Sequence, residues 1–221
     1  SSREYGYYIE SFFNPLLKFL VFWEKLLVST PWPVIIGIVC AFAFYGTRSY
    51  KIVIGIIISF FFVGYMGMWG DMMESMGFII VATIMAIAFG IPLGIWMAKS
   101  NRAQAIITPI LDFMQTLPPF VYLIPVVMLL GIGKIPGLIS VIVYAIPPMI
   151  RLTNLGIREV DHEILEAADS FGATPWQKLT QVQFPLALPT IFAGVNQTIM
   201  MALAMVIIAS MIGVKGLGQE V

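Results

Sequence analysis

The sequence predicts an all-α, polytopic membrane protein, on three observations. Hydrophobic residues make up 59% of the 221 residues and charged residues only 11%, which is far from the averages of soluble domains. Six apolar stretches approach or exceed the roughly 20 residues that a helix needs to cross the hydrocarbon core of a bilayer. Aromatic side chains stand near the ends of these stretches, where amphipathic rings prefer the membrane interface: Trp32, Tyr45, Tyr50, Trp69 and Trp96.

The first segment, residues 1–30, is expected to be an extracytoplasmic or interfacial amphipathic segment. Residues 12–28 place their apolar side chains on one helical face. Lys18, Glu24 and Lys25 interrupt this run, which makes a further span the weaker alternative. Residues 31–76 follow and are expected to hold two additional membrane spans, at 32–46 and 52–70.

Residues 77–221 are expected to form a core domain with apolar stretches at 77–98, 105–133, 135–150 and 185–214. Prolines recur in these stretches, and each removes a backbone donor that neighbours or water must compensate, so such helices tend to line cavities. Gly90 and Gly94 lie one helical turn apart, a spacing that lets two helix backbones approach closely.

The distribution of Lys and Arg among the connections predicts the orientation in the membrane. Basic residues collect in alternate connections, which makes those three connections cytoplasmic and the amino terminus external. They are Arg48 and Lys51, then Lys99 and Arg102, then Arg151, Arg158 and Lys178.

The longest polar connection, at about residues 154–184, is expected to form two short helices. Glu159, Glu163, Glu166 and Ser170 recur on one face of an amphipathic helix, which Gly172 ends. Thr174 then caps a second helix, with Pro175 at its first position and Gln177 completing a capping box. By composition alone, an acidic stripe of this kind is as often a solvated surface as a docking site.

The sequence offers no catalytic or metal site, so we expect no enzyme. It contains one Cys and one His, and no pattern of His, Cys or paired carboxylates suggests a metal or catalytic cluster. The nearest approach to a phosphate-binding loop, residues 131–134, is followed by Ile135 where a hydroxyl is required. Acidic and basic residues are equal in number, at 12 each, which gives no reason to expect nucleic acid as a partner.

The spacing within the polar connection resembles the EAA loop of permease subunits of bacterial ABC importers. Glu166-Ala167-Ala168, Gly172 four residues later and Val182-Gln183-Phe184-Pro185 carry that resemblance. Several other segments are similar to the glycine betaine/proline family of these permeases, the importers of quaternary amines. These segments are 109–118, 120–125, 147–153, 193–200, 208–213 and 216–218.

The resemblance implies a MetI-like ABC importer permease fold with about six spans in this chain, and it has two departures. Val182 and Phe184 stand where the EAA pattern usually has Ile and Leu, a change similar in kind. Family members continue past the Gly216-Leu217-Gly218 segment into a further membrane helix, so we expect a final span beyond Val221.

The resemblance also implies a function and a set of partners. The chain would be the permease subunit of an ATP-driven importer in the bacterial plasma (inner) membrane, working with two copies of a cytoplasmic ABC ATPase and an extracytoplasmic substrate-binding protein. A second permease copy and membrane lipid are further expected partners. ATP and Mg would bind in the ATPase, and this chain would bind no cofactor. Glycine betaine is the favoured substrate, with trimethylamine N-oxide, choline, carnitine and proline betaine behind it.

Two sets of residues are expected to carry this function. The set that couples to the ATPase is Glu163, Glu166, Ala167, Ala168, Gly172, Ala173 and Trp176. The translocation pathway is expected to use Gln115, Thr116, Pro118, Tyr122, Asn196, Gln197 and Met200. For the polar residues among them, a role in hydrogen bonds between helices is equally expected. Asp112 is expected to pair with Lys99 or Arg102. An ion-coupled secondary transporter or a channel is the alternative function, since broken helices suit those as well.

Overall fold

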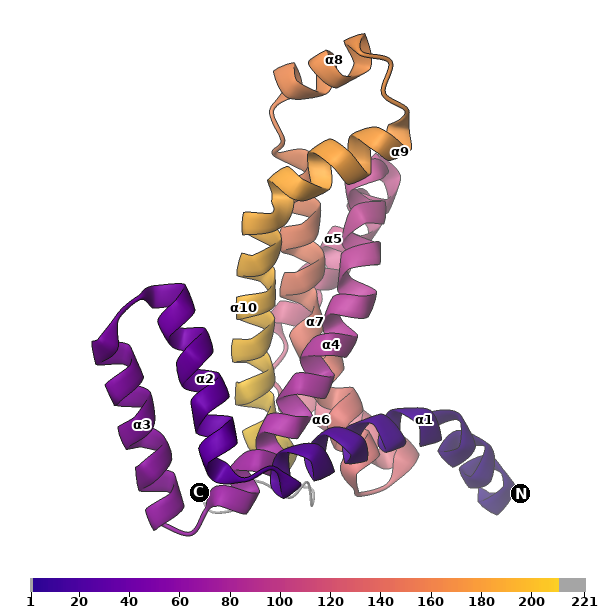
Figure 1. Ribbon diagram of the computed structural model, residues 1–221. Helices are drawn as coiled ribbons and strands as arrows, with labels where there is room; N and C mark the ends of the chain where they lie inside the picture. The colour runs from indigo at the N-terminus through magenta and orange to yellow at the C-terminus, as the bar shows by residue number, and fades with distance from the viewer. Residues whose placement is uncertain (1, 211–221) are drawn as a thin grey trace.

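The computed structural model describes residues 2–210, with side chains from Phe13 onward, and these residues are helical apart from short turns (Figure 1). The elements in chain order are α1 (Ser2–Ser29), α2 (Trp32–Thr47), α3 (Tyr50–Tyr65), α4 (Trp69–Lys99), α5 (Asn101–Thr116), α6 (Phe120–Leu130), α7 (Lys134–Arg158), α8 (His162–Ser170), α9 (Pro175–Gln177), the π-helix η1 (Lys178–Gln183) and α10 (Phe184–Ala209).

Three long helices, α4, α7 and α10, form the central bundle (Figure 1). Among the described residues, each of these three helices is long and apolar enough to cross a membrane on its own. The third is α10 together with α9 and η1. Their shared core contains Phe78, Val141 and Met205, all fully buried. A core of this kind excludes lipid from the bundle and fixes the register of the three helices.

Two further apolar segments are bent pairs of helices. The stretch 105–133, which is longer than one span needs and was open to a tilt or a break, is divided into α5 and α6, which meet at 96°. Leu117 is extended, with φ −76° and ψ 136°, because the ring of Pro118 disfavours the helical conformation in the residue before it. The helices α1, from Phe13, and α2 meet at 102°. Counting each bent pair as one span gives up to five spans within the part of the chain that the structure describes, and α3 is a shorter apolar helix. The expected number of six is therefore approximate.

The amino-terminal helix α1 runs across one end of the bundle, roughly perpendicular to it, whereas α2 and α3 form a hairpin beside the bundle (Figure 1). Leu20 of α1 is fully buried in the main core. Glu24 is also buried, and its carboxylate accepts a hydrogen bond of 2.6 Å from Lys134 at the start of α7. The interfacial position expected for residues 1–30 stays a prediction.

Small residues bring α4 close to α7, as the spacing of Gly90 and Gly94 predicts. A Cβ atom at Gly94 would stand 2.5 Å from the Cβ of Thr153 and 2.8 Å from the carbonyl oxygen of Ile150. Any side chain at this position would therefore push the two helices apart.

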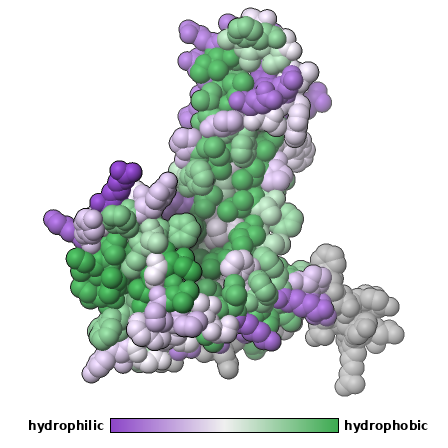
Figure 2. Space-filling view, in the orientation of Figure 1, coloured by the Kyte–Doolittle hydropathy of each residue, from purple (hydrophilic) through white to green (hydrophobic). Residues whose placement is uncertain are grey.

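The surface hydropathy matches this arrangement. In Figure 2 apolar residues cover the sides of the α2–α3 hairpin and of the bundle, whereas hydrophilic residues gather at the α8–α9 end and at the turn between α2 and α3. Both hydrophilic regions point the same way, away from the end that α1 crosses (Figure 1). The apolar belt is the surface expected to face lipid.

Candidate functional site

The polar connection between α7 and α10 forms an elbow that projects beyond one end of the bundle (Figure 1). We define the elbow as residues 161–183, which comprise α8, a turn, α9 and η1. The continuous helical segment formed by α9, η1 and α10, which we call the rod, bends as it passes from the elbow into the bundle (Figure 1).

Helix α8 begins later than the sequence pattern predicts. Asp161 is its N-cap, and the Asp161 carboxylate accepts a hydrogen bond of 3.0 Å from the backbone N–H of Glu163. Glu159 was expected on the same helix, but it lies at the C-terminal end of α7. The acidic stripe of α8 is therefore shorter than predicted and retains Glu163 and Glu166.

The turn after α8 is a Schellman motif centred on Gly172. The backbone N–H of Ala173 donates to the carbonyl of Ala168, and that of Gly172 donates to the carbonyl of Asp169. Gly172 has φ +78°, in the left-handed region where a residue without Cβ is favoured. The prediction that Gly172 ends the helix is confirmed, and the two bonds explain why glycine stands there.

The second helix begins as predicted. Thr174 accepts a hydrogen bond from the backbone N–H of Gln177, and the Gln177 side chain accepts one from the backbone N–H of Thr174, which completes the capping box. Pro175 occupies the first turn, where its missing N–H costs nothing.

The six residues from Lys178 to Gln183 form a π-helix, which the sequence pattern did not predict. Its wide turn is closed by the backbone N–H of Phe184, which donates to the carbonyl of Leu179 five residues earlier. Pro185 follows at once, and a proline in a helix cannot donate to the carbonyl four residues before it and crowds that carbonyl. This conflict gives a physical reason for the widened turn.

The elbow presents two large aromatic side chains to the surroundings. Phe171 is 92% exposed and Trp176 is 71% exposed. His162 Nδ1 lies 3.1 Å from Glu166 Oε1, one turn along the same exposed face. Of the predicted coupling residues, Glu163, Glu166, Ala167, Gly172 and Trp176 are exposed, and Ala168 and Ala173 are half-buried. All seven therefore lie together on one projecting structure.

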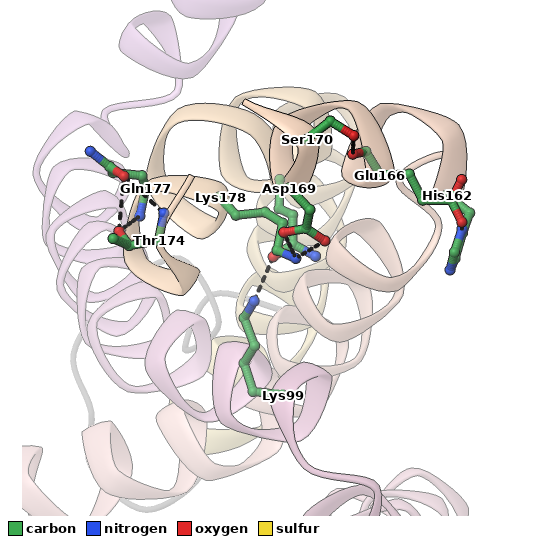
Figure 3. Close-up of polar contacts among 9 residues, drawn as sticks. Lys99, His162, Glu166, Asp169, Ser170, Thr174, Gln177 and Lys178 are labelled. Atoms are coloured by element: carbon green, nitrogen blue, oxygen red, sulfur yellow. Dashed lines mark hydrogen bonds and ion pairs between the residues drawn. The ribbon is translucent and has the colours of Figure 1, made fainter. Parts of the chain in front are cut away.

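Polar contacts that the sequence did not predict tie the elbow together and to the bundle (Figure 3). Lys178 Nζ lies 2.6 and 2.7 Å from the two carboxylate oxygens of Asp169, across the Gly172 turn. Lys99, the last residue of α4, donates a hydrogen bond of 2.5 Å to the side chain of Gln183. Opposite charges on either side of the turn glycine were the only sequence signal for the first of these contacts.

The expected pairing of Asp112 with Lys99 or Arg102 is wrong. Arg151 of α7 donates to the Asp112 carboxylate, while Lys99 contacts Gln183. Asp112 lies about three helical turns from the start of α5, and therefore far from Lys99 and Arg102. The neighbouring helix α7 supplies its partner instead. The bond joins α5 to α7.

The predicted pathway residues fall into two groups. Gln115, Thr116 and Pro118 stand at the α5–α6 break, and Tyr122 bridges it by donating to the carbonyl of Met114. Asn196, Gln197 and Met200 lie midway along α10 and are exposed. Since α5 packs mainly against α4 and α7, the described residues of one chain do not bring the two groups together.

The fold and the elbow define an all-helical, multi-pass membrane protein of the transport-permease class. The chain belongs to the family of binding-protein-dependent transport system inner membrane components, whose family model matches residues 90–221. The matched region starts within α4 and includes the whole elbow and α10. Among the described residues, no group of three or more His, Cys, Asp or Glu side chains could hold a metal ion.

Three relatives illustrate the similarity. The chain is 56% identical over 153 residues to the glycine betaine/carnitine transport permease GbuB of Listeria monocytogenes, covering 69% of this chain and 54% of that protein. It is 50% identical over 198 residues to the glycine betaine/proline betaine permease ProW of Escherichia coli, covering 90% and 56%. It is 39% identical over 190 residues to the trimethylamine N-oxide permease TmoV of Ruegeria pomeroyi, covering 86% and 29%. The chain thus spans about half the length, or less, of these relatives.

A solved structure shares the fold. A chain of the MetNI methionine ABC transporter, in an inward-facing conformation, superposes with a TM-score of 0.59 over 66% of this chain and 74% of its own length, at 21% identity. The MetI-like fold expected from the EAA resemblance is thereby confirmed.

Proposed function

We propose that this chain is the membrane-spanning subunit of an ATP-driven importer for a small quaternary amine or related osmolyte. The observation that carries the proposal is the elbow, a projection with two exposed aromatic side chains and an acidic face, whose helical segment is continuous with the bundle helix α10. In this proposal a cytoplasmic ABC ATPase binds and hydrolyses ATP with Mg, and its movement reaches the membrane through the elbow. Two ATPase copies and two permease copies would make the assembly symmetric.

The placement of basic residues supports a cytoplasmic elbow. The elbow, the α2–α3 turn and the α4–α5 turn lie toward the same end of the molecule (Figure 1). These connections carry or adjoin Arg48, Lys99, Arg102 and Lys178. Short loops rich in Lys and Arg remain on the cytoplasmic side of a membrane.

An open stripe along α10 supports a translocation pathway between two permease copies. Phe192, Asn196, Met200, Leu203 and Ile207 are exposed at spacings that place them on one helical face. An amide at membrane depth is unfavourable in lipid, so the stripe is expected to face protein or water. A second copy covering this stripe would bring Asn196 and its neighbour Gln197 to the interface of the two copies.

The substrate class is proposed from the relatives, whose names specify glycine betaine, carnitine, proline betaine and trimethylamine N-oxide. Glycine betaine is the favoured substrate, and choline is a further candidate. Selection is assigned to an extracytoplasmic substrate-binding protein, because the aromatic cage that holds a quaternary ammonium ion need not reside in the membrane subunit.

Purification of the chain from its native membranes tests the proposal. A nucleotide-binding subunit and a substrate-binding protein should co-purify, and glycine betaine should bind to the latter and stimulate ATP hydrolysis. Solute transport by the purified chain down an ion gradient, with no ATPase present, would favour a secondary transporter or channel instead.

Glu166→Lys should separate ATP hydrolysis from transport. Glu166 is 69% exposed on its side chain and faces outward from α8. If it meets a basic group of the ATPase, reversal of its charge should lower substrate-stimulated ATP hydrolysis by roughly tenfold or more, because like charges across an interface cost several kcal/mol. The measurement is ATPase activity of the reconstituted complex with and without glycine betaine.

The matched control is Glu159→Lys, which makes the same charge change at an exposed position outside α8. This variant should retain normal stimulation. Equal stimulation in wild type and Glu166→Lys would remove Glu166 from the docking surface.

A further inference from the structure

We propose that Asp169 and Lys178 form a brace that sets the angle between α8 and the rod made of α9, η1 and α10, so that movement of α8 is transmitted to α10. We name this ion pair the elbow brace. The inference rests on the proposed function, since it assigns the residues that keep the proposed lever stiff. Asp169 and Lys178 are positioning residues and lie outside the predicted docking set.

Helix α8 has few other restraints on its orientation. None of the described side chains of α8 is buried, and η1 is the element that it chiefly contacts. The turn that joins α8 to α9 contains Gly172, around which a Cβ would meet no atom within 4 Å. A short helix without a buried face, joined through a glycine turn that local hydrogen bonds alone close, depends on side-chain contacts across the turn to hold its orientation.

The elbow brace is that contact. The Asp169–Lys178 bond crosses the turn and joins residues nine positions apart, and both carboxylate oxygens accept from the same ammonium group. The Lys178 side chain is only 22% exposed, so its stem is held against the elbow, while Asp169 remains 54% exposed. An ion pair between two helices with no shared core contributes mainly to their relative orientation rather than to overall stability.

The rod on the other side of the brace is itself anchored to the bundle. Gln183, at the end of η1, is 8% exposed and accepts the hydrogen bond from Lys99 of α4. Nearby, Arg158 of α7 donates a hydrogen bond of 2.8 Å to the carbonyl of Met97 of α4. The base of the elbow is therefore tied to α4, and α4 is tied in turn to α7. The turn between α8 and α9 is then the joint that needs a brace.

A lever transmits force only when its joint is stiffer than the load it moves. With the brace intact, displacement of α8 by a docked motor would carry α10 with it and bias the bundle between two arrangements. Without the brace, α8 would pivot at Gly172, and ATP would be hydrolysed with less movement of the bundle. Loss of the brace should therefore change the yield of transport per ATP and leave docking in place.

The test uses the complete transporter complex, reconstituted in proteoliposomes with radiolabelled glycine betaine as the probe. The brace is removed by Asp169→Asn and, separately, by Lys178→Met, and it is rebuilt with reversed polarity by the double variant Asp169→Lys/Lys178→Asp. The matched control is Ser170→Ala, which removes a 2.9 Å hydrogen bond to the Glu166 carbonyl within α8 and crosses no joint. Glycine betaine transported per ATP hydrolysed is measured for each.

Each single variant should lower transport per ATP by roughly fivefold or more, the lower end of the range for coupling between two sites. Basal ATP hydrolysis and complex assembly should stay at wild-type levels in the single variants. The double variant should restore wild-type transport per ATP, and Ser170→Ala should retain it. Hydrogen exchange of the α8 backbone amides provides a second measurement: it should accelerate in the single variants and slow again in the double variant.

Wild-type transport per ATP in both single variants, or unchanged exchange in α8, would overturn the brace. If wild-type protein itself recruits no ATPase, the proposed function fails and the brace fails with it. If the wild-type complex couples ATP hydrolysis to transport and both single variants do so equally well, the elbow brace is overturned and the proposed function stands.

Discussion

Lys134→Met should destabilise the protein by about 3 kcal/mol, the lower end of the range for removing one partner of a buried ion pair, because the Lys134 side chain is 30% exposed while Glu24 is buried. Glu24 is 6% exposed, and its Oε2 lies 2.6 Å from Lys134 Nζ. The other oxygen, Oε1, has no hydrogen-bond partner among the described residues, so Lys134 is the main compensation for this buried carboxylate. Thermal unfolding in detergent, followed by size-exclusion chromatography with fluorescence detection, measures the effect.

The double variant Glu24→Met/Lys134→Met should recover most of the stability that the single variant loses. Replacing both members of a buried ion pair by apolar side chains of similar size is often neutral or stabilising, since no charge is left to desolvate. Lys18→Met, which removes an exposed lysine from the same α1, should change little. A double variant no more stable than Lys134→Met would show that the ion pair is not what holds α1 across the bundle.

The sequence predicts local features of the elbow well, because each depends on residues a few positions apart. The Gly172 turn and the Thr174 capping box are closed by backbone and side-chain bonds within six residues, so composition and spacing determine them. The break between α5 and α6 follows from Pro118 in the same way, although its angle does not.

Contacts between helices are the part that the sequence could not provide. Lys134 meets Glu24 from 110 positions away, and Arg151 meets Asp112 from 39 positions away. Which charges pair depends on how the helices are arranged, and helical periodicity describes only the face that each residue occupies on its own helix. The prediction for Asp112 failed for this reason, because it chose partners by proximity in sequence.

Gly94→Ala should disrupt the contact between α4 and α7 and reduce stability by about 3 kcal/mol, near the upper end of the range for overpacked cores. The new Cβ would stand 2.5 Å from the Cβ of Thr153 and 2.8 Å from the Ile150 carbonyl oxygen, and neither atom is at the free end of a flexible side chain. Relief requires the two helix backbones to separate, which would disturb the buried core that they share with α10.

The matched control for Gly94→Ala is Gly55→Ala in α3, where the added Cβ meets no atom within 4 Å. Alanine is favoured over glycine within a helix by about 1 kcal/mol, so the control should be neutral or slightly more stable than wild type. That propensity also acts at position 94, so the difference between the two variants measures the clash alone. Because α7 leads directly into the elbow and α4 supplies its Lys99 anchor, Gly94→Ala should also lower substrate-stimulated ATP hydrolysis in whatever complex still assembles. Equal melting temperatures for the two variants would mean that α4 and α7 are not held at the close distance that Gly94 permits.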